Sequence, residues 1–156
     1  MNALFELIGE RMSGRDYDKL MSLDPHVFDN CKVERKQVTR DPDPSRDIVK
    51  VFPSVETIVA KDFAKSIKFA KVYYHSYYDE EDEGPMATLR STRTAEDELK
   101  FLKDLESINY DSGYGSQELF GIIMFKDGTW LRRHEYDGSE YWEKIIIPQE
   151  SDYFNL

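Results

Sequence analysis

Residues 119–147 read LFGIIMFKDGTWLRRHEYDGSEYWEKIII and contain two Asp-Gly pairs, at 127–128 and 137–138. Each pair separates runs of aromatic and β-branched residues, and Asp-Gly between such runs is typical of a tight hairpin turn. The pattern therefore predicts an antiparallel meander of three strands, over residues 118–125, 130–136 and 140–147. Pro148 ends the third strand because proline donates no hydrogen bond to a sheet ladder.

The segments before the meander predict helices and a further hairpin. Apolar residues recur at the helical period in four segments, 4–12, 15–23, 53–70 and 94–108. Ser54 is the expected cap of the third helix, and Thr94, followed by three acids, is the expected cap of the fourth. A turn at 41–45 that contains two prolines separates β-rich residues 32–39 and 48–52, which are expected to pair. From residue 69 the pattern is ambiguous, and a strand over 71–78 is favoured over continued helix.

Length and composition indicate how these elements are organised. The chain has 156 residues, of which 40% are hydrophobic, which is enough for one core of ordinary size. We expect a single α+β domain over residues 1–156, in which helices pack on one face of an antiparallel sheet that includes the meander. An exposed acidic loop is predicted at 79–93 and a tail at 149–156.

Several classes of protein are disfavoured by simple counts. Cys31 is the only cysteine, so neither an internal disulfide nor a cysteine-rich zinc site is expected. Residues 1–12 contain two glutamates and lack the basic and apolar regions of a secretory signal. The longest apolar run is far shorter than the roughly 20 residues that span a bilayer. We therefore expect a cytoplasmic protein with no membrane partner.

The formal net charge of −10 is unevenly distributed along the chain. Residues 1–75 hold 12 acids and 13 bases, whereas residues 76–156 hold 19 acids and 8 bases. Nucleic acids and anionic membranes attract basic surfaces, so this bias disfavours both as partners of the whole domain. It favours a partner whose own surface is basic.

Catalytic motifs are weak. The three histidines, His26, His75 and His134, lie in no recognisable catalytic arrangement, and the chain has no nucleophile elbow or phosphate-binding loop. Residues 34–36, with Asp29 upstream, match only the short part of a metal-dependent nuclease motif. We therefore predict no catalytic, cofactor or metal site, with a small hydrolase or nuclease as a less favoured alternative.

An acidic run flanked by tyrosines is the strongest candidate site. Five consecutive acids lack the spaced geometry of a metal loop, so they are expected to be solvated or to face a partner. Tyrosines in loops supply a large contact area at a low entropic cost, as in antibody paratopes. Because the sequence neighbours of these tyrosines are mostly acidic, direct binding of nucleic acid is disfavoured. The predicted partner-binding residues are Asp79, Glu80, Glu81, Asp82, Glu83, Tyr73, Tyr77, Tyr78 and Tyr114.

Residues 125–143, FKDGTWLRRHEYDGSEYWE, resemble a pattern in small uncharacterised bacteriophage accessory proteins. The resemblance implies a phage origin, and small acidic phage proteins often inhibit host enzymes. By that analogy we expect a non-enzymatic protein that inhibits a host protein, most plausibly a nucleic-acid-directed defence enzyme of the restriction or CRISPR type. The alternative is an assembly or regulatory subunit that pairs through an exposed sheet edge, for example as a homodimer.

Overall fold

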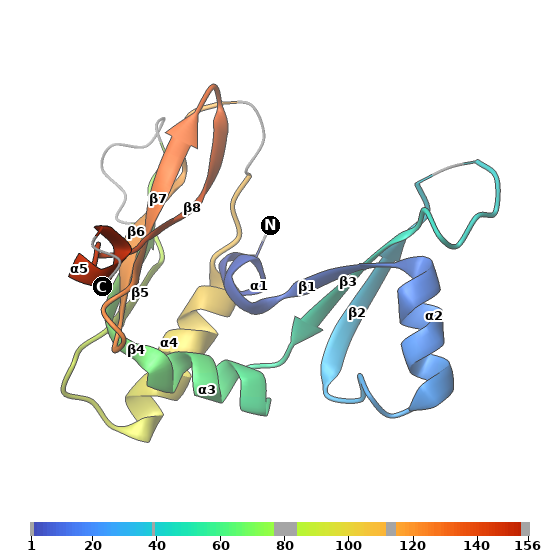
Figure 1. Cartoon of the computed structure of the whole chain (residues 1–156), viewed down its shortest axis with the longest axis horizontal. Coiled ribbons are helices and arrows are strands. Elements are labelled where there is room, and N and C mark those ends of the chain that lie inside the picture. The colour runs from blue at the N-terminus through green and yellow to red at the C-terminus, as the bar shows by residue number, and fades with distance from the viewer. Residues whose placement is uncertain (1, 39, 77–83, 112–114, 154–156) are drawn as a thin grey trace.

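The computed structural model describes residues 2–38, 40–76, 84–111 and 115–153, which form helices and two antiparallel sheets. Figure 1 shows the larger sheet on the left and the smaller sheet on the right, with helices α1, α3 and α4 between them. The larger sheet has the strand order β5-β4-β6-β7-β8 and the smaller one β1-β3-β2. The expected α+β class with antiparallel pairing is confirmed.

The meander is confirmed as β6 (Leu119–Phe125), β7 (Trp130–Tyr136) and β8 (Ser139–Ile145). The two Asp-Gly turns differ in geometry. Asp137 and Gly138 both have positive φ, 51° and 80°, as a two-residue type I′ turn requires. In the first turn only Gly128 has positive φ, at 89°, and Asp127 Oδ1 accepts hydrogen bonds from the amide and hydroxyl of Thr129.

Strand β4 (Ile67–Tyr74) lies at the centre of the larger sheet, between β6 and β5 (Met86–Leu89). The strand predicted near residue 71 is therefore correct, although it begins four residues earlier, and its predicted end at 77–78 lies outside the described residues. The predicted exposed loop over 79–93 is wrong for residues 86–89. They form β5, and its Ala87 and Leu89 are buried, with 0% and 3% exposure.

Helices α3 (Ile58–Ser66) and α4 (Ala95–Ser107) precede β4 and follow β5. The capping box at Thr94 is confirmed, since Thr94 and Asp97 exchange side-chain to backbone hydrogen bonds. The helix predicted over 53–70 is too long at both ends. Thr57, not Ser54, caps α3, and Ile67 and Ala70 belong to β4.

The predicted helix over 4–12 is also too long. Helix α1 covers Ala3–Ile8, and residues Glu10–Ser13 form β1, so that Met12 lies in a strand. Gly9 is the C-cap of the helix, with an extended backbone, and a Cβ atom there would lie 1.9 Å from the Phe5 ring. Ser13 was expected to stop the first helix, but it caps α2 (Gly14–Leu23) by accepting a hydrogen bond from the amide of Asp16.

The predicted hairpin around 41–45 is confirmed as β2 (Cys31–Lys36) paired with β3 (Ile48–Pro53). Strand β1 pairs on the other side of β3 and completes the smaller sheet. Arg35 joins α2 to this sheet, since its guanidinium contacts Asp18 at 3.0 Å and Asp47 at 2.9 Å.

The main core lies between α1, α3, α4 and one face of the larger sheet, which we call the inner face. Helices on one face of the sheet were expected and are found. The fully buried residues include Ile67, Val72, Phe101, Leu105 and Ile123. In the predicted tail, α5 (Glu150–Tyr153) is a short helix that buries none of its residues. Among the described residues, no helix has the length and apolar character needed to cross a membrane.

Candidate functional site

One end of the larger sheet gathers three connections that are far apart in the sequence. Strands β4 and β7 end there and β5, β6 and β8 begin there, so the described residues of segments 75–85, 108–118 and 135–139 meet at this end. The amide of Tyr74 donates to the carbonyl of Pro85 at 3.0 Å, and the amide of His75 donates to that of Glu118 at 2.9 Å. The three segments contain nine Asp and Glu residues and no Lys or Arg. We call this region the acidic end.

The predicted partner-binding residues divide between two groups. Eight of them lie outside the described residues: Asp79, Glu80, Glu81, Asp82, Glu83, Tyr77, Tyr78 and Tyr114. Ser76 and Gly84, on either side of residues 77–83, are described and lie at the acidic end. Tyr73 is described too, and its ring stacks on Phe120, with centroids 5.5 Å apart and an interplanar angle of 15°.

The second face of the larger sheet, which we call the outer face, points away from the core. Residues directly paired across antiparallel strands share a face, so the strand register assigns its members. They are Met86 and Thr88 of β5; Phe69, Lys71 and Tyr73 of β4; Phe120, Ile122 and Met124 of β6; Trp130, Arg132, His134 and Tyr136 of β7; and Ser139, Tyr141, Glu143 and Ile145 of β8.

The outer face is apolar and partly open to solvent. The exposed fractions of Phe69, Met86 and Tyr141 are 39%, 42% and 43%, and that of Tyr136 is 73%. His134 and Trp130 share this face with Arg132 and Tyr136, as the alternation along the strand predicted. Contiguous apolar surface of this kind marks interaction sites in soluble proteins.

No protein-family model, curated protein or solved structure matches the chain.

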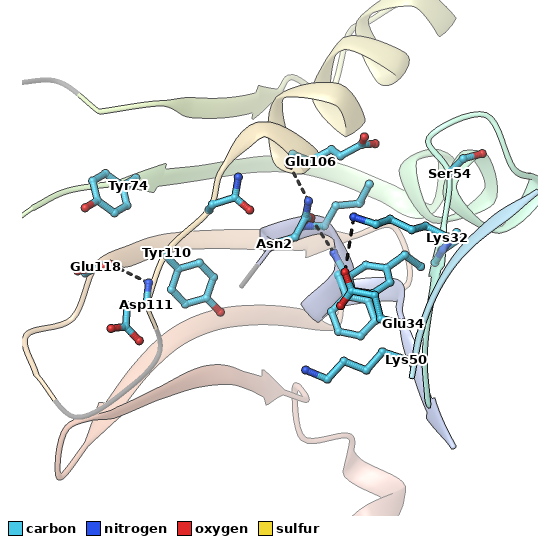
Figure 2. Close-up of a pocket in the computed structure, with 15 residues that line it drawn as sticks. Asn2, Lys32, Glu34, Lys50, Ser54, Tyr74, Glu106, Tyr110, Asp111 and Glu118 are labelled. Carbon is cyan, nitrogen blue, oxygen red and sulfur yellow. Dashed lines mark hydrogen bonds and ion pairs between the residues drawn. The ribbon is translucent and has the colours of Figure 1, made fainter. Parts of the chain in front are cut away.

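A cleft of about 950 Å³ lies between the two sheets, with α1 at its base (Figure 2). One wall is the smaller sheet, where the Lys32 and Glu34 side chains form an ion pair at 3.5 Å. The ammonium groups of Lys32 and Lys50 lie 5.7 and 5.9 Å from the ring centroids of Phe52 and Phe5. Those two rings pack on each other, with centroids 3.8 Å apart.

The opposite wall of the cleft is acidic. It contains Glu106, Asp111 and Glu118, and the Glu118 carboxylate accepts a hydrogen bond from the amide of Asp111 at 2.9 Å. Asn2 joins this wall to α1, since its amide donates to the carbonyl of Glu106 at 2.7 Å. Because the walls carry opposite charges, the cleft favours no single class of ligand.

A buried ion cluster lies behind the cleft, on the inner face. The Arg133 side chain is 1% exposed and contacts Glu140 at 2.7 Å and Glu6 of α1 at 3.0 Å. Its guanidinium carbon lies 5.2 Å from the ring centroids of both Tyr110 and Trp142. Burial raises the pKa of Glu6, although the Arg133 charge lowers it in part. The cluster ties α1 to β7 and β8.

The residues considered for catalysis are dispersed. His26 pairs with Asp29 at 2.7 Å on the surface, His75 follows β4, and His134 lies on the outer face 3.8 Å from Glu143. None of the three histidines lines the cleft. Of the acids in the short nuclease-like match, Glu34 pairs with Lys32 at 3.5 Å and Asp29 pairs with His26. In the described part of the chain, no three His, Cys, Asp or Glu residues converge on a possible metal position.

Two features of the candidate site could not be located from the sequence. The outer face was visible only in part, through the alternation along 130–136. The acidic end was visible only as the run 79–83, because Asp111, Glu135 and Asp137 are distant in sequence and meet through the strand order. Tyr110, the residue before Asp111, is buried with 4% exposure.

Proposed function

We propose that the chain is a non-enzymatic interaction protein that binds, through its acidic end, a partner protein with a basic surface. The observation that supports this proposal is that the described ends of three connections converge, and that the sequences of these connections hold nine acids and no bases. Charge of one sign concentrated in one place speeds the encounter with a surface of opposite charge and orients the two molecules.

Tyrosines at the same end supply the apolar contacts that charge alone lacks. Tyr136 precedes the β7–β8 turn and is 73% exposed, and Tyr73 lies one residue before the end of β4. Tyrosine is enriched among the residues that dominate binding energy at protein interfaces. We therefore assign Tyr73 and Tyr136, with the acids around them, to the proposed interface.

The proposed consequence of binding is inhibition of the partner. Enzymes that handle nucleic acid present grooves lined by Lys and Arg, and an acidic protein end of this kind competes with phosphates for such a groove. The resemblance of residues 125–143 to phage accessory proteins favours a host defence enzyme of the restriction or CRISPR type as the partner.

The test is a comparison of charge-neutralised variants in capture from a bacterial lysate. One variant changes Asp79–Glu83 to the corresponding amides. The control removes five exposed charges elsewhere, none of them in an ion pair among the described residues: Glu56, Asp62, Glu96, Glu150 and Asp152.

The natural chain and the control should retain a common protein at about 50 mM salt and release it at about 500 mM, since screening weakens exposed charge pairs. The acidic-end variant should fail to retain that protein at either salt concentration. Equal retention by all three chains, or indifference to salt, would refute the electrostatic interface.

A second candidate function follows from the edge of the larger sheet. Among the described residues β8 pairs only with β7, so its other side presents free backbone groups to a further strand. A homodimer or an assembly built through this edge is the alternative. Light scattering coupled to gel filtration distinguishes them, because a monomer that binds the basic partner excludes obligate pairing through β8.

A further inference from the structure

Aromatic rings extend across the outer face on adjacent strands. Tyr73 and Phe120 are stacked on β4 and β6, and His134 and Tyr141 meet edge to face on β7 and β8 at 5.5 Å. Phe69 and Trp130 lie further from the acidic end, on either side of Met124 in the strand register. An open antiparallel sheet that displays rings in this way offers stacking positions for unpaired bases.

Cations rather than acids accompany these rings on the outer face. Lys71 and Arg132 point outward, and the ammonium group of Lys71 lies 5.6 Å from the Tyr73 ring centroid. The only outward carboxylate on the five described strands is that of Glu143, which Arg132 pairs with at 3.0 Å. The outer face therefore carries a net positive charge although the chain carries −10.

The separation of acids from aromatic rings is not evident in the sequence, because acidic and aromatic residues alternate along the strands. Glu140 is the immediate neighbour of Tyr141, and it points to the inner face, where it binds Arg133 at 2.7 Å. Glu135, the neighbour of His134, pairs in register with Glu140 and shares its face. The pleat of the sheet therefore places the acids next to His134 and Tyr141 in the sequence on the side opposite the rings.

Further cations flank the outer face at the end opposite the acidic end. Arg90 follows β5 and Lys126 follows β6, and both are exposed without an ion pair among the described residues. Asp127, beside Lys126, is hydrogen-bonded to Thr129. The charge therefore changes sign along the strands of the sheet.

We infer that the outer face binds single-stranded nucleic acid, with bases stacked on its rings and phosphates held by Lys71, Arg132 and the flanking Arg90 and Lys126. Duplex is not the expected ligand because its bases are already stacked inside the helix. Repulsion from the acidic end places the strand over the half of the face that contains Phe69 and Trp130. This inference does not rest on the proposed protein partner, although Tyr73 and Tyr136 of the partner interface at the acidic end also belong to the outer face.

The experiment measures fluorescence anisotropy of labelled oligo-dT and oligo-U of about 15 nucleotides, with a duplex of equal length as a control. Each phosphate contact contributes about −0.7 to the slope of log affinity against log salt on single strands. Two to four cations therefore predict a slope of about −1.4 to −2.8, or a loss of about 7- to 50-fold between 50 and 200 mM salt.

Two pairs of substitutions separate stacking from charge. Phe69→Ser with Trp130→Ser should weaken binding at least about tenfold without changing the salt slope, because stacking involves no counterion release. Lys71→Gln with Arg132→Gln should reduce the slope by about 1.4. The matched controls, Tyr153→Ser and Lys19→Gln with Lys61→Gln, change exposed residues outside the outer face and should leave binding unchanged. Thermal unfolding followed by circular dichroism confirms that each variant is folded.

Three results would overturn the inference: no anisotropy change up to about 100 µM protein at 50 mM salt, equal affinity for duplex, or an aromatic variant that binds as the natural chain does. The first would assign the outer face to a protein partner. Neutralising Asp79–Glu83 separates the two proposals, since it should strengthen oligonucleotide binding while it abolishes capture of the basic partner.

Discussion

Replacing Arg133 with methionine should lower the free energy of unfolding by about 3–5 kcal/mol at neutral pH. The substitution removes the one cation that contacts both Glu6 and Glu140, whose side chains are 18% and 3% exposed. Two carboxylates are then left in the core without a counter-charge. The rings of Tyr110 and Trp142 also lose the guanidinium that lies over them. A domain of this size has a stability of about 5–15 kcal/mol, so a change of this magnitude is measurable.

Urea unfolding followed by circular dichroism at pH 7 and pH 4 measures this loss and its cause. At pH 4 the Glu6 carboxyl, whose pKa burial already raises, is protonated, so one uncompensated charge disappears. Each unit by which the variant raises that pKa further costs about 1.4 kcal/mol at pH 7, and this cost is removed at pH 4. The destabilisation should therefore be smaller at pH 4.

A triple variant guards against a chain that fails to fold. Combining Arg133→Met with Glu6→Gln and Glu140→Gln removes all three charges together and should restore at least about 2 kcal/mol relative to Arg133→Met alone. A loss below about 1 kcal/mol for the single variant, or an equal loss at both pH values, would show that the cluster does not hold α1 on the sheet.

Three further substitutions test other parts of the structure. Burial raises the pKa of Glu6, so just above pH 4.5 the folded chain still binds a proton that the unfolded chain has released. The stability of the fold should therefore fall as the pH rises through that window. The Glu6→Gln variant should lack this fall when melting temperatures are compared across pH 4–7. Gly121→Ala should cost about 2–4 kcal/mol in urea unfolding, since Gly121 has a φ of 150° and its Cβ would lie 2.4 Å from the Lys71 carbonyl oxygen. Thr94→Ala should cost about 1 kcal/mol by removing the α4 cap, and Thr94→Ser should restore most of it.

The elements predicted correctly are those whose signals are local. The two Asp-Gly turns and the Thr94 cap each lie within a few residues of the structure that they determine, so the meander and α4 could be placed from sequence. The helices predicted over 4–12 and 53–70 continued too far for a physical reason. Helical spacing does not show where tertiary pairing takes over, and Met12 and Ala70 pair with strands that are distant in sequence.

The candidate site was predictable only where a single segment carries it. The acidic run 79–83 is recognisable in the sequence as five consecutive acids. The acidic end, in contrast, depends on the order of the strands in the sheet, which no local sequence pattern specifies. The outer face requires both the strand pairs and the alternation along each strand. Strand β5 was missed because its four residues are too short for a periodic signal.

The pairing of Tyr74 with Leu119 has a consequence for the order of folding. Strand β4 pairs with β6 across residues 75–118, a long connection that contains β5 and α4, whereas the turns that join β6, β7 and β8 close within a few residues. Local hairpins form in about 1–10 µs, and pairing across a long loop is slower because its ends must first be brought together. Until β4 pairs with it, the apolar strand β6 (LFGIIMF) has one unpaired edge. An unpaired apolar edge can pair with strands of other chains and so lead to aggregation. The yield of native protein therefore depends on how fast α4 returns the chain to the sheet, and lower temperature or lower concentration during refolding favours the native pairing over aggregation.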